Sequence, residues 1–282
     1  MNIQNNVNLS SFTTLKIGGN AKNLYEPESV EEFIKLLESI GEEKVYILGG
    51  GSNLLINDKK TFDRVICTKR MTSIFSDLEG NVIVEAGTRN QKLINYLLEK
   101  GLGGIEYLSS VPGTIGGAIC MNAGTGIATN KYIGDHVISV DVYSNGTIKT
   151  LSRKECEFGF RDSLIKRDNL VVLKVAFRFP KVDQTVSREI IKQHLESVRK
   201  YHDLEKPNVG SVFNKFNPFI INVARKLQLG FPKGVRFSKK TSDWIVNNGK
   251  GKYRQALFLI NFIKFIHKIL FLKVNTEIII WR

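Results

Sequence analysis

The sequence predicts an α+β protein with two parts. Segments with the apolar spacing of strands and of helices alternate along the 282 residues, which are enough for one large domain or two. Two glycine-rich loops, at residues 49–53 and 111–126, occur in the first part, where strands dominate. Residues 181–201 have the pattern of a junction. We therefore expect a first domain at 1–182, with subdomains at about 1–69 and 70–182, and a second, smaller α+β domain at 183–282.

The first predicted helix follows a capping box. Ser29 and Glu32 have the spacing of that motif, and an apolar pattern continues from them to Gly41. The short apolar run Val45–Leu48 then predicts a buried strand that leads directly into the loop at 49–53.

A second strand and helix precede the longer loop. Val82–Glu85 is predicted to be a strand, and Thr88 with Gln91 has the spacing of a second capping box. That helix is expected to run through Leu98 and to end at Gly101.

A hairpin is expected after the longer loop. Val137–Tyr143 and Thr147–Leu151 flank Ser144-Asn145-Gly146, which is typical of a tight turn. The segments that follow are predicted to be a strand at Leu170–Phe179, a helix from Thr185 to Tyr201, two further helices and a terminal strand at Glu277–Trp281.

Composition limits the compartment and the partners. The three cysteines, Cys67, Cys120 and Cys156, suggest neither a disulfide framework nor a zinc site, and the polar N-terminus has no signal-peptide pattern, so a cytoplasmic protein is expected. The net charge of +14 attracts anions in general, but the basic residues are spread along the chain, which favours a solvated surface over a nucleic-acid footprint. Lysines interrupt the apolar stretch Ala256–Leu272, which predicts a buried amphipathic helix and not a membrane span.

The two glycine-rich loops predict a cradle for an anionic cofactor. Glycine lets backbone approach a ligand closely, and successive N–H groups can converge on a phosphate. Neither loop fits a Rossmann or a Walker A motif, since position 54 is Leu and no Gly-Lys-Ser/Thr follows. Either loop alone could equally be a tight turn. The expected cofactor contacts are Gly49, Gly50, Gly51, Ser52, Asn53, Gly113, Thr114, Gly116, Gly117 and Asn122.

Together the two loops resemble the FAD-binding domain of the vanillyl-alcohol-oxidase (PCMH) type, in which loops hold the cofactor. The resemblance implies FAD. No histidine lies between residues 1 and 135, so a histidyl-flavin link from these loops is excluded and the FAD is expected to be non-covalent.

Six motifs in order make the resemblance more specific. They are Thr14-Leu15-Lys16-Ile17-Gly18-Gly19, 48–55, 113–122, Phe158-Gly159-Phe160-Arg161-Asp162-Ser163, Gly210-Ser211-Val212-Phe213 and Asn275-Thr276-Glu277. This order resembles the UDP-N-acetylenolpyruvoylglucosamine reductase family in its compact second type, over nearly the whole chain. The resemblance implies an NADPH-dependent flavoenzyme that reduces UDP-N-acetylglucosamine enolpyruvate to UDP-N-acetylmuramate for peptidoglycan. It also implies a monomer with small-molecule partners, without nucleic acid, membrane or metal.

The resemblance assigns a catalytic role to three residues. Arg161 would stabilise the enolate, Ser211 would donate the proton, and Glu277 would assist at the same site. Each has a plainer alternative: a surface ion pair for Arg161, a turn or cap for Ser211, and a strand-edge carboxylate for Glu277.

The chain departs from the family pattern at three places. Phe160 replaces the usual Tyr, the run 214–218 is two residues longer than the usual Lys-Asn-Pro, and 240–244 reads Lys-Thr-Ser-Asp-Trp where the family favours Lys-His-Ala-Asn-Phe. These departures leave open a different FAD-dependent oxidoreductase on the same scaffold. The net charge of +14 leaves open a second alternative, a non-enzymatic anion-binding protein.

Overall fold

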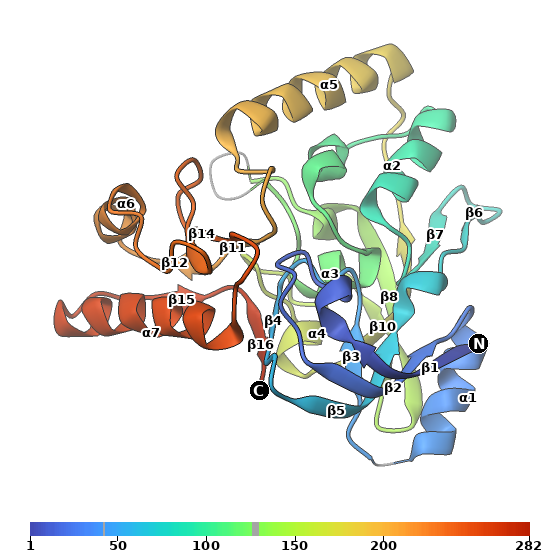
Figure 1. Ribbon diagram of the computed structural model, residues 1–282. Coiled ribbons are helices and arrows are strands. Elements are labelled where there is room, and N and C mark those ends of the chain that lie inside the picture. The colour runs from blue at the N-terminus through green and yellow to red at the C-terminus, as the bar shows by residue number, and fades with distance from the viewer. Residues whose placement is uncertain (42, 126–129) are drawn as a thin grey trace. The chain divides into compact units, whose positions relative to one another are not determined.

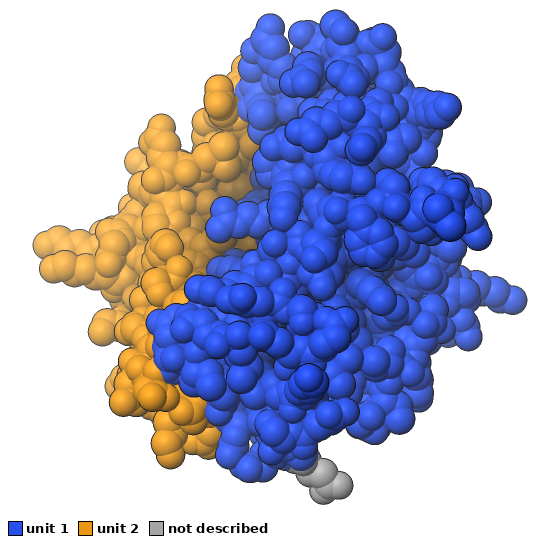
Figure 2. Space-filling model, turned by 90° about the vertical axis from the view of Figure 1, so that its right-hand side faces the viewer, with its two compact units in different colours: residues 1–4, 24–50, 64–196 blue, residues 5–23, 51–63, 197–282 orange. Residues whose placement is uncertain are grey.

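The computed structural model describes residues 1–41, 43–125 and 130–282, so Gly126, the last residue of the longer loop, lies outside the described part. The chain divides into two compact units, which Figure 2 colours separately. Unit 1 comprises residues 1–4, 24–50 and 64–196, and unit 2 comprises residues 5–23, 51–63 and 197–282. The sequence predicted a cofactor-binding domain at 1–182 and a substrate-binding domain at 183–282. This assignment of binding roles to the two parts of the chain stays a prediction.

Unit 1 contains most of the strands. Its elements are α1 (Val30–Ile40), β3 (Tyr46–Leu48), η2 (Thr68–Arg70), β6 (Ile74–Ser76), β7 (Val82–Glu85), α2 (Asn90–Glu99), η3 (Glu106–Ser110), α3 (Ile115–Cys120), η4 (Ile133–His136), β8 (Val137–Ser144), β9 (Thr147–Ser152), α4 (Leu164–Arg167) and β10 (Val171–Phe177). Four elements have residues in both units: β1 (Asn2–Asn8), β2 (Asn20–Glu26), β5 (Thr61–Cys67) and α5 (Gln184–Tyr201).

A five-stranded sheet in the order β6-β7-β10-β8-β9 forms the centre of unit 1 (Figure 1). The predicted hairpin is confirmed as β8 and β9, whose turn places Asn145 at φ +47° and Gly146 at φ +79°, as a type I′ turn requires. The predicted strand at 170–179 is confirmed as β10, although it ends at Phe177. Alternate residues of these strands, such as Val140 and Val175, are fully buried in the core with α2 and α3.

The predicted cap of α1 is confirmed. The Ser29 hydroxyl accepts a hydrogen bond from the Glu32 N–H at 3.2 Å, and Gly41 ends the helix at φ +67°. The strand expected next is β3, which pairs in parallel with β5, Leu48 lying opposite Cys67. Strand β3 delivers the chain directly to Gly49.

The predicted cap of α2 is wrong. Helix α2 begins at Asn90, its N-cap position is Arg89, and no side chain caps it. Thr88 is completely buried, and its carbonyl accepts the Ile115 N–H at 2.8 Å, so tertiary contacts with the longer loop hold this residue in place of a helix cap.

Unit 2 consists of the C-terminal helices and strands together with η1 and β4 from the N-terminal part of the chain. Its elements are η1 (Leu9–Phe12), β4 (Leu54–Ile56), β11 (Asn208–Ser211), β12 (Phe213–Lys215), α6 (Pro218–Lys226), β13 (Val235–Phe237), β14 (Trp244–Asn247), α7 (Tyr253–Ile269), β15 (Asn275–Thr276) and β16 (Ile279–Trp281). Three strands form a sheet in the order β11-β14-β13, and Figure 1 shows helices α6 and α7 in the same unit. These elements share one apolar core that includes Ile221, Leu259 and Ile263.

The predicted terminal strand at Glu277–Trp281 is interrupted. The chain first pairs with β12 through β15, then breaks at Glu277 and Ile278, and then pairs in parallel with β4 through β16. The strand is interrupted because the chain changes its partner strand from β12 to β4, and Glu277 lies between the two paired segments.

The predicted amphipathic helix at 256–272 is confirmed as α7, whose buried residues include Ala256, Leu259 and Ile263. Over the part of the chain that the structure describes, every helix is too short or too polar to span a lipid bilayer.

Candidate active site

The two glycine-rich loops touch each other in unit 1. A Cβ atom at Gly50 would lie 2.5 Å from the Cα atom of Gly113, and a Cβ atom at Gly49 would lie 2.7 Å from the Thr114 hydroxyl. The first contact is to backbone and cannot yield by rotation of a side chain. Glycine at position 50 is therefore required by the close approach of the two loops.

The longer loop is fastened to its surroundings through its backbone. Gly113 has φ +144°, and its carbonyl accepts the Asn90 N–H at 3.3 Å. The Gly116 N–H donates to the Ala86 carbonyl at 2.8 Å, and a Cβ atom at Gly116 would lie 3.0 Å from that of Ala86. Gly117 follows in the first turn of α3. The loop is thus a fixed surface.

Five buried polar atoms in the segment 88–114 have no hydrogen-bond partner among the described residues. They are the hydroxyl oxygens of Thr88, Tyr107, Ser109 and Thr114 and the Oδ1 atom of Asn90. Such atoms cost about 1–3 kcal/mol each when they stay unpaired, so native proteins avoid them. Their concentration beside the longer loop indicates that a polar ligand completes this part of unit 1.

Tyr107 carries one of these unpaired atoms on a side chain that is 8% exposed. Burial raises the pKa of its phenol, and the negative charges of Asp135 and Glu106 act in the same direction, whereas Arg161 opposes them. The phenol is therefore protonated at any working pH and can act as a hydrogen-bond donor.

Replacing Thr114 by valine tests whether the unpaired polar atoms of segment 88–114 face a ligand. Valine has the same shape but no hydroxyl, so we expect the flavin-free protein to gain stability, by about 1 kcal/mol, because an unpaired buried group is removed. We expect flavin affinity to fall, by about fivefold, because the hydroxyl can no longer bond the ligand. Chemical unfolding of the apoprotein and flavin titration measure the two effects.

Thr13→Val is the matched control for the stability measurement. Thr13 is equally buried, but its hydroxyl donates to the Ile17 carbonyl at 3.0 Å, so its loss should destabilise the apoprotein. If Thr114→Val destabilised the apoprotein as Thr13→Val does, the Thr114 hydroxyl would already have a protein partner.

Asn122 has a structural role in this structure. Its Nδ2 atom donates to the Gly159 carbonyl at 2.9 Å, and its Oδ1 atom accepts the Gly134 N–H at 3.1 Å. Its backbone has φ +42°, which asparagine tolerates better than most residues. The side chain thus joins the longer loop to the segment that carries Arg161, and contact of Asn122 with the cofactor stays a prediction.

Arg161 lies in a strained turn of unit 1. Its φ is +55°, an uncommon value for a residue with a side chain, and the turn is closed by the Gly159 N–H, which donates to the Asp162 carbonyl at 2.9 Å. The guanidinium donates to the Gly124 carbonyl at 2.9 Å and lies 5.7 Å from the centre of the Phe160 ring. These contacts hold a permanent positive charge beside the longer loop.

The second half of the shorter loop belongs to unit 2. Gly51 has φ +69°, and a Cβ atom there would lie 2.0 Å from the Phe12 carbonyl oxygen. The Thr14 hydroxyl reaches the Ser52 carbonyl at 3.5 Å and donates to the Asn208 carbonyl at 2.7 Å. Gly51, Ser52 and the strand that leads to Ser211 are therefore held together.

Ser211 and Glu277 are neighbours in unit 2. The Glu277 N–H donates to the Val212 carbonyl at 2.8 Å, and β12 pairs with β15 so that Phe213 lies opposite Thr276. Asn53 joins the same group, because its Nδ2 atom donates to the Glu277 carbonyl at 3.3 Å. Two of the three predicted catalytic residues are thus brought together from positions 66 residues apart in the sequence.

Asp243 is a buried carboxylate beside Ser211, and the prediction of site residues missed it. It is 5% exposed, and its Oδ2 atom accepts the Phe213 N–H at 3.1 Å. Burial raises the pKa of Asp243, and hydrogen bonds from the backbone of Phe213 and from the Ser211 side chain oppose that rise. A sequence signal existed: Asp243 and Glu277 are the only acidic residues between 206 and 282.

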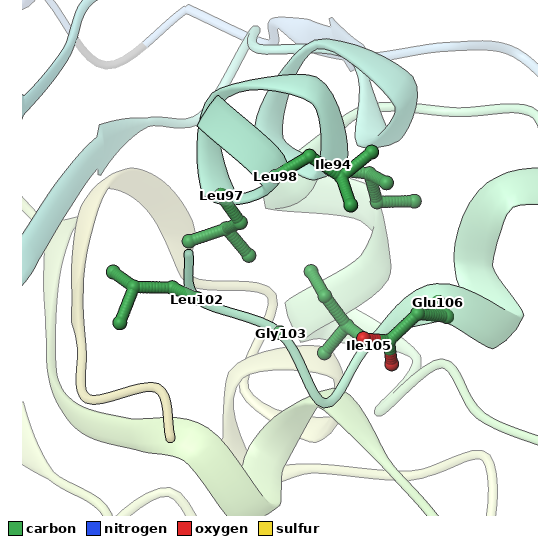
Figure 3. A pocket seen from close by; sticks show the side chains of 7 residues that line it. All are labelled: Ile94, Leu97, Leu98, Leu102, Gly103, Ile105 and Glu106. Carbon is green, nitrogen blue, oxygen red and sulfur yellow. The ribbon is translucent and has the colours of Figure 1, made fainter. Parts of the chain in front are cut away.

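A separate hollow in unit 1 is too small to be this site. Figure 3 shows the apolar side chains of α2 and of the segment after it, together with Glu106. The cavity that these residues line has a volume of only about 10 Å³. Sites for small molecules usually enclose about 300–1,000 Å³. The Glu106 carboxylate is already engaged by the Gly104 N–H at 3.0 Å and the Ser187 hydroxyl at 2.8 Å.

Comparisons with known proteins concern the family and the fold. Residues 21–152 match the family model described as an FAD binding domain. The chain is 33% identical to the UDP-N-acetylenolpyruvoylglucosamine reductase of Thermotoga maritima over 280 residues, which cover 97% of this chain and 96% of that one. It is 34% identical to the reductase of the same name from Prochlorococcus marinus subsp. pastoris, over 92% and 89% of the two chains. The crystal structure of the UDP-N-acetylenolpyruvylglucosamine reductase from Thermus caldophilus superposes over the full length of both chains with a TM-score of 0.82 at 26% identity.

The fold and the site therefore define an FAD-dependent oxidoreductase, with an α+β fold and an FAD-binding domain of the vanillyl-alcohol-oxidase type. The chain belongs to the UDP-N-acetylenolpyruvoylglucosamine reductase family. The resemblance drawn from six motifs is confirmed, and the alternative of a non-enzymatic anion-binding protein is excluded.

The residues of unit 1 fit the requirements of FAD. Gly50 and Gly113 leave room where the two loops meet, and the orphaned atoms of Thr114 and Ser109 lie in the adjoining segment. A cofactor with a pyrophosphate and a ring edge rich in acceptors and donors can satisfy such groups.

Proposed function

We propose that the protein reduces UDP-N-acetylglucosamine enolpyruvate to UDP-N-acetylmuramate, with NADPH as the reductant, in the cytoplasmic synthesis of peptidoglycan precursors. The observation that carries the proposal is the contact between the Ser211 and Glu277 segments in a chain whose relatives have this name and span its whole length. We further propose that Gly49–Asn53 and Gly113–Asn122 hold the non-covalent FAD, that residues 183–282 bind the substrate, and that the protein works as a monomer.

Each of the three predicted catalytic residues has a distinct task in this proposal. When bound, FAD supplies the hydride that is added to the enol-ether double bond. Arg161 stabilises the negative charge that develops next to the substrate carboxylate, since its guanidinium is always charged and can hold a carboxylate with two hydrogen bonds. Ser211 donates a proton to the substrate carbon that carries the developing negative charge. Glu277 either orients this charged part of the substrate or returns a proton to Ser211.

Asp243 acts as a positioning residue in the same proposal. By accepting the Phe213 N–H, its carboxylate fixes the turn that presents the Ser211 hydroxyl. Asparagine, the residue that the family favours here, keeps an oxygen that can accept this hydrogen bond and carries no charge.

Replacing Asp243 by asparagine is expected to stabilise the protein at neutral pH. The folded-state pKa of this carboxyl is raised above its usual 3.8, so the folded protein binds the proton more tightly than the unfolded chain. Its contribution is therefore present at low pH and is lost as the pH rises through the raised pKa. The melting temperature of Asp243→Asn should exceed that of the unmodified protein at neutral pH, and the difference should vanish in acid.

Turnover measurements distinguish a positioning role of Asp243 from a role in stability alone. Asp243→Asn should keep most of its turnover, whereas Asp243→Ala, which lacks the acceptor for the Phe213 N–H, should slow substrate reduction without affecting flavin content. A stability difference between Asp243→Asn and the unmodified protein that did not change with pH would contradict the raised pKa.

Product analysis tests the proposed reaction. The purified yellow protein is incubated with NADPH and UDP-N-acetylglucosamine enolpyruvate, and the nucleotide sugar is examined by mass spectrometry and by co-elution with UDP-N-acetylmuramate. Gain of two hydrogens by the substrate and loss of its double bond support the proposal. An unchanged substrate, with a flavin that NADPH does reduce, would instead indicate another substrate on the same scaffold.

A further inference from the structure

Helix α7 of unit 2 has an apolar stripe on its exposed side. Its buried side is formed by Tyr253, Ala256, Leu259, Ile260, Ile263 and His267. On the opposite side Phe258 is 54% exposed, Phe265 59% and Ile269 57%. Since residues four, seven and eleven positions apart lie along one side of a helix, these residues and Phe262 form one line.

The stripe continues beyond the helix at both ends. The ring of Phe231, in the loop after α6, lies 6.1 Å from that of Phe258, which in turn stacks on Phe262 at 6.0 Å. At the other end Leu270 is 54% and Phe271 96% exposed. We call Phe231, Phe258, Phe262, Phe265, Ile269, Leu270 and Phe271 the aromatic stripe. Single exposed apolar residues are ordinary, but a continuous group of this kind marks an interaction site.

The net charge is concentrated in the C-terminal part of the chain, to which this stripe belongs. Residues 197–282 contain 17 Lys and Arg against 4 Asp and Glu, whereas residues 1–196 contain 24 against 23. The basic residues are spread along the chain, as expected, but the acidic residues are not, so nearly all of the net charge of +14 lies in the C-terminal part. Arg254 and Lys268 are exposed on α7 beside the stripe, and Lys233 and Lys250 line a hollow together with Phe231.

The sign of this charge selects the kind of partner. Two copies of such a strongly basic surface repel each other, which disfavours a dimer formed through the stripe. A nucleic acid would pair with the lysines, and its bases could stack on the phenyl rings, but Ile269 and Leu270 offer nothing to phosphates or to bases. An anionic lipid surface accommodates both features, since apolar side chains enter the boundary of the acyl chains while lysine and arginine contact the phosphates.

We propose that the aromatic stripe of α7 and the basic residues beside it dock this protein on the surface of a membrane that contains anionic lipids. The helix lies in the interface and does not cross the bilayer. The proposal departs from the expectation, implied by the family resemblance, that the protein has no membrane partner. It is independent of the substrate, because no stripe residue has a role in the reaction.

Vesicle co-sedimentation of the flavin-loaded protein tests the proposal. Vesicles of phosphatidylcholine alone are compared with vesicles that also contain phosphatidylglycerol. We expect binding only to the second kind, and we expect it to weaken at high salt because screening removes the attraction of the lysines. Equal binding to both kinds of vesicle, or binding to neither, would overturn the proposal.

Substitutions on the stripe identify the surface. Phe265→Ser and Phe271→Ser should each weaken binding about tenfold, since a phenyl ring leaves the interface. Arg254→Gln and Lys268→Gln should each weaken it about fivefold, because each basic residue near an anionic surface contributes about that factor. Flavin content, melting temperature and turnover in free solution should stay unchanged, which shows that the variants are folded.

Phe75→Ser is the matched control, because Phe75 is 52% exposed on β6 of unit 1. It should bind vesicles as the unmodified protein does. If Phe265→Ser and Phe75→Ser behaved alike, the stripe would not be the docking surface. The proposal would also be contradicted if the stripe were a dimer interface. In that case the protein would sediment in a concentration-dependent way without vesicles, and Phe265→Ser would abolish this behaviour.

Discussion

Replacing Ser211 by alanine is expected to slow substrate reduction by about 10²–10⁴-fold, the usual loss when a positioned proton donor is removed. Reduction of the flavin by NADPH should stay unchanged, because no proton of Ser211 is needed in that half of the reaction. The turn that carries Ser211 should also survive, since the Phe213 N–H still donates to Asp243. Stopped-flow absorbance of the flavin measures the two halves separately.

Ser242→Ala is the matched control for this variant. Ser242 is exposed and lies next to Asp243 in the sequence, so its hydroxyl can be removed without touching the Ser211 turn. It should leave both half-reactions at their original rates. An equal loss in both halves for Ser211→Ala would show that Ser211 supports the fold or the flavin and does not donate the proton.

Replacing Gly50 by valine is expected to yield a protein with less than about a tenth of the normal flavin, because the new side chain cannot fit between the two loops. Already the Cβ atom would lie 2.5 Å from the Gly113 Cα atom and 3.1 Å from its carbonyl carbon, so the backbone must move. Misplacing a close backbone approach costs several kcal/mol of the free energy of unfolding or of binding. Flavin absorbance per polypeptide and the melting temperature give the result.

Gly80→Asn serves as the control for that variant. Gly80 is an exposed turn residue at φ +78° with no atom within 4 Å of a Cβ position, and asparagine tolerates this backbone conformation. It should be as yellow as the unmodified protein. Normal flavin content in Gly50→Val would mean that the contact between the two loops does not shape the cofactor site.

Local sequence signals predicted those elements whose structure depends on near neighbours. The cap at Ser29 and the turn at Asn145-Gly146 each involve residues within four positions, and both are confirmed. The motifs that carry the family resemblance are also local strings, and they identified the family because their order along the chain is specific.

Elements that depend on distant residues could not be predicted in this way. Thr88 has the spacing of a helix cap, yet its backbone is taken by the longer loop and its hydroxyl faces the region where polar partners are missing. The terminal strand breaks at Glu277 because the chain changes its partner from β12 to β4. Asp243 reaches Ser211 only because β14 pairs with β11, a register that no local pattern reveals.

The most direct test of the central claim is an anaerobic measurement of the two half-reactions. NADPH is added to the purified protein in the absence of oxygen, and the flavin absorbance is followed before and after addition of UDP-N-acetylglucosamine enolpyruvate. We predict that NADPH bleaches the flavin and that the colour returns only when the enolpyruvyl substrate is added. A flavin that stays bleached in the presence of that substrate would contradict the proposed reaction.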